Sequence, residues 1–116
     1  MALFYNLAKV YALSENDSEF VKSIIELFIT EVPEDLAHIK YGIKEKDYKK
    51  VYDYSHKIQP SLDLLGMNVA FEEIKLVEAW TKVQGKRKEI NDTFEGIENQ
   101  IENAIKEIKK DFKLKY

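Results

Sequence analysis

Apolar residues recur along this chain at spacings of three and four, which is the period of helices that lie on a core. No segment shows a convincing period of two, so strands are not expected. The clearest segment is about residues 88–113, whose alternating spacings of four and three are typical of a bundle seam. We expect this seam to be buried against residues 16–31 and 47–66. Its apolar positions are Ile90, Phe94, Ile97, Ile101, Ala104, Ile108 and Phe112.

Sparse helix breakers divide the first half of the chain into three expected helices, beginning with a short one over residues 3–13. Asn16, followed three residues later by Glu19, resembles a capping box and predicts the start of the second helix. We expect that helix to end near Glu31, because Pro33 disfavours helical geometry in the preceding residue and suits the first turn of a third helix. The expected inner positions are Leu3, Leu7 and Val10 in the first helix, Phe20, Ile24, Leu27 and Phe28 in the second, and Leu36, Ile39 and Ile43 in the third.

The second half contains two more helices before the final seam. Asp47 is a good cap for one that ends at Gly66, and Asn68 can cap the next, which ends near Gly85. Their expected inner positions are Val51, Ser55, Ile58, Leu62 and Leu65, and then Ile74, Val77 and Trp80. The pattern therefore predicts an all-α fold, an antiparallel four-helix bundle with one or two short extra helices at the N-terminus or in the connections.

Length and composition narrow the class of protein. The 116 residues are expected to form one domain, residues 1–116, with a core over about 14–113 and residues 1–13 packed on it. The absence of cysteine excludes disulfides, zinc–thiolate sites and cysteine nucleophiles, and two histidines leave little room for a metal centre. A formal net charge of −3 argues against a nucleic-acid partner.

No apolar run approaches the ~18 residues of a membrane span, and the first residues do not resemble a signal peptide. We therefore expect a cytoplasmic protein without a membrane partner. The Met1 start favours a free-standing protein over a domain cut from a longer chain.

Helix geometry predicts which way one of the two histidines faces. Successive helical residues are rotated by roughly 100°, so His56 lies roughly 140° from Val51, the centre of the inner stripe of its helix. We expect His56 to face solvent, with Tyr52 and Asp63 among its neighbours on that side. Taken alone, an exposed histidine on a helix has no particular role.

The residues that follow give His56 a context. The stretch Ser-His-Lys-Ile-Gln-Pro-Ser-Leu-Asp-Leu-Leu-Gly over 55–66 resembles the signature of histidine-containing phosphotransfer (HPt) domains. That family has a small residue before its phosphorylated histidine, an aliphatic residue two positions after it, and an apolar–glycine pair closing the motif. The positions that match are Ser55, His56, Ile58, Ser61, Leu65 and Gly66.

The resemblance extends over roughly residues 14–113. Glu-Leu-Phe at 26–28 through Glu-Val-Pro at 31–33 is similar to the family's leucine–phenylalanine helix with its proline turn. Asp47 precedes His56 by nine residues, where the family usually caps the histidine helix.

Two positions depart from the family's pattern. Its lysine three residues after the histidine, thought to steady phosphate charge, is Gln59, and its glycine at the next position is Pro60. Gln59 can still donate a neutral hydrogen bond, and Lys49 and Lys57 offer nearby charge, although Lys57 points well away from His56. We expect the helix to continue through Pro60 with a bend that is convex on the His56 face.

The resemblance implies a phosphorelay intermediate. His56 would accept a phosphoryl group from the aspartate of a response-regulator receiver domain, which carries the Mg²⁺, and pass it to another receiver. A hybrid sensor histidine kinase is the implied upstream partner. The glycines are isolated, so no phosphate-cradling loop or ATP site of its own is expected; the chain is a carrier without its own cofactor, and not an enzyme. Because we expect the apolar seam at 88–113 to be buried inside the bundle, we expect a monomer.

The alternatives are an adaptor that binds a receiver or another protein without carrying phosphate, and a metal site at the helical pair Asp53 and His56, which has too few partners for a di-metal bundle. His38 is expected to be a plain surface residue. The tyrosines at 41, 48, 52 and 54 are expected to be half-buried rather than a stacking surface.

Overall fold

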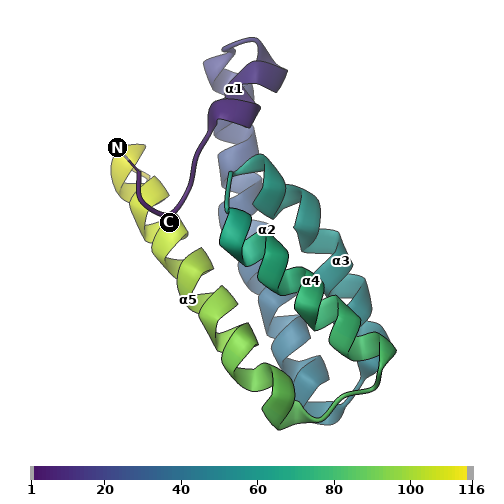
Figure 1. Cartoon of the computed structure of the whole chain (residues 1–116). Helices are drawn as coiled ribbons and strands as arrows, with labels where there is room; N and C mark the ends of the chain where they lie inside the picture. Colours follow the sequence, from purple (N-terminus) through teal and green to yellow (C-terminus); the bar gives the residue numbers. More distant parts are fainter. Residues whose placement is uncertain (1, 115–116) are drawn as a thin grey trace.

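The computed structural model describes residues 2–114 as five helices joined by turns, with no strand in that range (Figure 1). α3 packs against α2 and α4, α5 packs against α4 and α2, and the short α1 packs against α2. The all-α class expected from the sequence is therefore confirmed. The helices are α1 (Ala8–Ser14), α2 (Ser18–Glu45), α3 (Tyr48–Leu64), α4 (Asn68–Lys82) and α5 (Arg87–Asp111).

The expected helix boundary at Pro33 is wrong, because α2 runs through this proline as one helix of 28 residues. A proline inside a helix costs about 3 kcal/mol. The buried stripe of α2 keeps one register on both sides of the proline, and each buried aliphatic side chain stabilises the fold by about 1.5–3 kcal/mol, which outweighs that cost. This stripe comprises Val21, Ile25, Phe28, Ile29, Val32, Leu36, Ile39 and Ile43.

The expected inner face of the first part of α2 is also wrong, apart from Phe28. Phe20 and Leu27 are 45% and 52% exposed, and Ile24 is half-buried. Apolar residues occupy two neighbouring faces of this segment, and the stripe that continues past Pro33 decides which of them is buried.

Two caps and one helix start differ from expectation. The side chain of Asp17, rather than Asn16, accepts hydrogen bonds at the start of α2. Asn68 is the first residue of α4 and not its cap, a position that Met67 occupies. The expected helix over residues 3–13 begins only at Ala8, so Leu3 lies outside it and is exposed, whereas Leu7 and Val10 are buried as expected.

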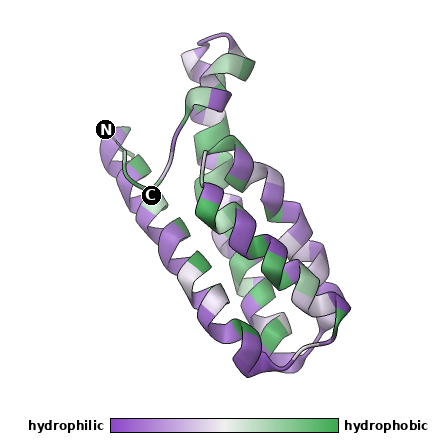
Figure 2. Ribbon diagram, viewed as in Figure 1, coloured by the Kyte–Doolittle hydropathy of each residue, from purple (hydrophilic) through white to green (hydrophobic). Residues whose placement is uncertain are grey.

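The remaining helices follow the sequence pattern closely. Asp47 caps α3 by accepting from the backbone N–H of Lys50, and the expected inner residues of α3 and α4 are buried. The apolar seam of α5 is buried up to Ile108, and Figure 2 shows hydrophobic colour on α5 on the side turned toward the other helices. The seam packs mainly on α4 and α2. The expected contact with α2 is therefore present, but α4 rather than α3 is the other main partner.

The turn between α3 and α4 requires glycine. Gly66 has a φ of +65°, and a Cβ at this position would lie 2.7 Å from the Cβ of Asn6. The backbone N–H of Asn6 donates to the carbonyl of Leu65, so the N-terminal segment is pinned against this turn. Within the described part of the chain, no helix is long and apolar enough to cross a membrane.

Candidate functional site

His56 lies in α3 with 66% of its side chain exposed, as the helical geometry predicts. α3 continues without interruption through Pro60, which is exposed, and ends at Leu64. The expectation that the helix does not break at Pro60 is therefore confirmed. The accompanying bend stays a prediction.

A carboxylate from the neighbouring helix holds the ring of His56. Oε2 of Glu78, in α4, lies 3.2 Å from Nδ1 of His56. Nε2 of Gln59 donates to the same oxygen at 2.5 Å. A carboxylate is an acceptor, so this contact favours the tautomer with the proton on Nδ1 and leaves a lone pair on Nε2. No side chain or backbone group among residues 2–114 hydrogen-bonds that Nε2 atom.

An aromatic ring and a lysine complete this cluster. The ring of Tyr52 is parallel to that of His56, with centroids 5.9 Å apart and an interplanar angle of 6°. Nζ of Lys82, one helical turn after Glu78 in α4, lies 5.9 Å from the Tyr52 centroid. The same Nζ lies 3.9 Å from Oε1 of Glu78. Tyr52, His56 and Gln59 from α3 thus meet Glu78 and Lys82 from α4, and we call these five residues the His56 cluster.

The two lysines singled out in the sequence are bound to other carboxylates. Nζ of Lys57 donates to Oδ1 of Asp35 in α2 at 2.9 Å, and Nζ of Lys49 donates to Oδ2 of Asp53 at 2.8 Å. The hydrogen bond to Asp35 raises the pKa of Lys57, and the hydrogen bond to Asp53 raises the pKa of Lys49, so both remain cationic at neutral pH. Neither of these carboxylates belongs to the His56 cluster.

Other candidate residues contact groups outside the His56 cluster. Asp63 accepts from Nζ of Lys9 at 2.7 Å, which ties α3 to α1. His38 is exposed, as expected, and its ring stacks on that of Tyr54 with centroids 4.4 Å apart. No group of three or more histidine or carboxylate side chains in residues 2–114 is arranged to hold a metal ion.

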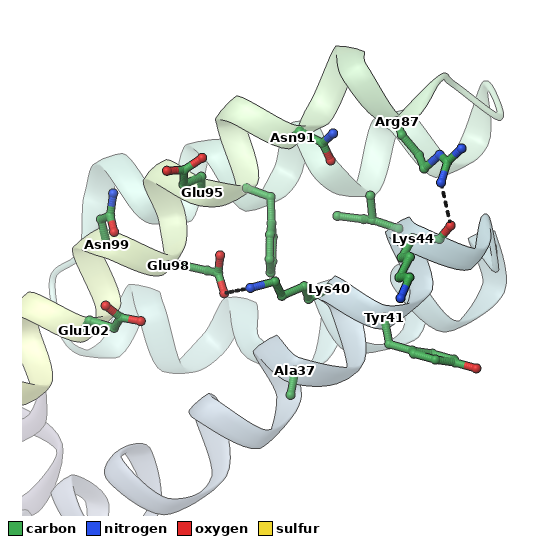
Figure 3. A pocket seen from close by; sticks show the side chains of 12 residues that line it. Ala37, Lys40, Tyr41, Lys44, Arg87, Asn91, Glu95, Glu98, Asn99 and Glu102 are labelled. Carbon is green, nitrogen blue, oxygen red and sulfur yellow. Dashed lines mark hydrogen bonds and ion pairs between the residues drawn. The ribbon is translucent and has the colours of Figure 1, made fainter.

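One hollow of the described surface lies between α2 and α5, and a smaller one lies between α2 and the histidine helix α3. The larger, about 880 Å³, lies between α2 and α5, and neither histidine lines it (Figure 3). An ion pair joins its walls, with Nζ of Lys40 3.9 Å from Oε2 of Glu98, and burial raises the pKa of Glu98. The smaller, about 150 Å³, lies between α2 and α3 and is lined by Lys57, Leu27 and Leu64, among others.

The sequence singled out His56, Gln59 and Tyr52, which the structure brings together, but not Glu78 and Lys82, which join them. These two lie on another helix, more than 20 residues from His56, and reach it only through the packing of α4 on α3. Their spacing of four, at the edge of the buried face of α4, was the only available signal. No family model matches the chain, and comparisons with curated proteins and with solved structures find no match either.

Proposed function

We propose that this chain is a phosphorelay intermediate of the HPt type, which carries a phosphoryl group on Nε2 of His56. The observation that supports this most strongly is an exposed histidine whose Nδ1 faces a carboxylate while its Nε2 has no hydrogen-bond partner among residues 2–114. The residues around it, from Ser55 to Gly66, carry the resemblance to the HPt signature.

An antiparallel four-helix bundle is part of this proposal. The helices α2, α3, α4 and α5 contact one another in the order of a closed ring, since α2 meets both α3 and α5, and α4 meets both as well. Only two or three residues join α2 to α3 and α3 to α4, and such short connections favour antiparallel neighbours. α1 is then the short additional helix.

In the phosphoryl transfer, the main contribution of this chain is to position the ring of His56. The lone pair on Nε2 attacks the phosphorus of a receiver's aspartyl phosphate. As the Nε2–P bond forms, the bond from phosphorus to the carboxylate oxygen breaks, and its electron pair stays on that oxygen. The proton on Nδ1 remains on the ring, which gains positive charge that the carboxylate of Glu78 stabilises. The reverse steps deliver the phosphoryl group to a second receiver.

Partners and location follow from the same proposal. Receiver domains supply the Mg²⁺ and the aspartate, and a hybrid sensor histidine kinase supplies the phosphoryl group upstream, all in the cytoplasm. Exposed apolar surface at the hollow between α2 and α3 offers a docking area, because Leu27 is 52% exposed and lines that hollow together with Lys57. The protein acts as a monomer in this proposal.

The test is transfer from purified receiver domains that have been phosphorylated with acetyl phosphate and Mg²⁺. We expect acid-labile phosphate on the wild-type chain and on His38→Gln, but none on His56→Gln. ATP alone is expected to leave the chain unlabelled. A complex with a receiver that forms without any transfer would instead support the adaptor, and labelling of His56→Gln would refute the proposed site.

A further inference from the structure

A cation for the phosphoryl group is missing from the position where the HPt pattern has it. Gln59 occupies that position and carries no charge. Its amide is already committed to the carboxylate of Glu78. A phosphoryl group on Nε2 of His56 would bring two negative charges close to that same carboxylate, so a positive charge is needed to offset the repulsion.

Lys82 is the cation that the packing of α4 on α3 brings to this place. Its Nζ contacts Oε1 of Glu78 while the other oxygen of that carboxylate contacts the ring of His56. The same Nζ lies over the ring of Tyr52, which is parallel to the histidine ring. Two separate contacts therefore place the ammonium group against Glu78 and Tyr52, the two residues that contact the His56 ring.

The contacts of Lys82 are weak enough to leave its side chain free to move. Its 3.9 Å separation from Glu78 is longer than a direct hydrogen bond, and its side chain is 66% exposed. By contrast, Lys49 and Lys57 make contacts of 2.8 and 2.9 Å to their own carboxylates. A lysine side chain has a flexible four-carbon stem, so its ammonium can turn from Glu78 to a nearby anion.

We infer that Lys82 neutralises the phosphoryl group on His56, taking the part of the lysine that position 59 lacks. This inference rests on the proposed phosphocarrier function. Before transfer, the ammonium balances the charge of Glu78. After transfer, it donates a charge-assisted hydrogen bond to a phosphoryl oxygen, while Glu78 keeps its contact with the Nδ1 proton of the ring.

The test is the partition of a phosphoryl group between His56 and free imidazole, with N-phosphoimidazole as the donor. One P–N bond breaks and another forms, so the equilibrium ratio reports the surroundings of His56 alone. We expect Lys82→Gln to lower the ratio of phosphorylated to free His56 about fivefold. Lys82→Arg keeps the charge and is expected to keep the wild-type ratio. Added salt is expected to lower the ratio in the wild type more than in Lys82→Gln.

Lys75→Gln is the matched control. Lys75 also lies in α4, pairs with a carboxylate at 3.4 Å and lies over an aromatic ring, but its partners are Glu72 and Phe71, outside the His56 cluster. We expect its ratio to equal that of the wild type, and thermal unfolding of all variants to match because both lysines are exposed.

Three results would overturn the inference: equal ratios for Lys82→Gln and wild type, equal losses for Lys75→Gln and Lys82→Gln, or a wild-type His56 that takes no phosphoryl group from N-phosphoimidazole. Failure of the proposed function would appear in a different experiment, as a lack of phosphoryl transfer from receiver domains. That failure would leave the effect of Lys82→Gln on the partition with imidazole unchanged.

Discussion

Replacing Ser55 with alanine is expected to stabilise the fold, because the hydroxyl of Ser55 is fully buried and has no hydrogen-bond partner among residues 2–114. An unpaired buried polar group costs about 1–3 kcal/mol, and alanine is favoured over serine in a helix by about 0.5 kcal/mol. The lost packing of one oxygen atom offsets about 0.5–1 kcal/mol of this gain. Together these contributions raise the free energy of unfolding of Ser55→Ala by about 0.5–3 kcal/mol, with a central value of about 1–2 kcal/mol.

Urea denaturation measures this change as a higher midpoint at an unchanged slope. For a domain of this size, the melting temperature is expected to rise by about 4–8 °C. Ser23→Ala is the matched control, since Ser23 is an exposed helical serine whose hydroxyl donates to the carbonyl of Phe20 at 2.8 Å. We expect the control to change the free energy of unfolding by no more than about 0.5 kcal/mol.

A Ser55→Ala variant that is less stable than the wild type, or no more stable than Ser23→Ala, would refute this reasoning. Either result would show that the Ser55 hydroxyl is satisfied inside the protein.

Three further predictions concern the site and the α2–α5 hollow. Glu78→Gln removes the charge that stabilises the phosphorylated ring, so receiver-dependent labelling of His56 is expected to slow by about tenfold while the fold is kept; an unchanged rate in stopped-time labelling would contradict this role. Burial raises the pKa of Glu98, so the native state binds this proton more tightly than the unfolded state and stability falls as the pH rises from the ordinary carboxyl range through the raised value. We therefore expect urea titrations to show a larger stability advantage of Glu98→Gln over the wild type at pH 7 than at pH 4. The same stability difference between the two proteins at both pH values would contradict this. Pro60→Gly restores the backbone N–H that proline lacks but adds glycine's flexibility, so we expect a stability change within about 1–2 kcal/mol and an altered rate of transfer; equal transfer rates would make Pro60 a tolerated substitution without a role.

Local rules were enough wherever one helix determines the outcome by itself. The exposure of His56 follows from the buried stripe of its own helix, because Val51 and Ile58 define which side of α3 faces inward. The seam of α5 and the capping role of Asp47 are local in the same sense.

Local rules failed wherever packing between helices chooses among local options. Pro33 has the marks of a helix start, but a core stripe that spans it overrides the local preference. Leu27 and Phe28 both look like core residues, and the register of that stripe buries only Phe28. Glu78 joins His56 only because α4 packs on α3 at one particular register, which no local spacing reveals.

The most direct measurement is the position of the phosphoryl group after transfer from a receiver, by ³¹P and long-range ¹H–¹⁵N NMR of the histidine rings. Because Glu78 accepts from Nδ1, the account predicts that His56 carries its proton on Nδ1 before transfer and its phosphoryl group on Nε2 afterwards. A phosphoryl group on Nδ1 of His56 or on His38, or no phosphohistidine with any receiver, would contradict it.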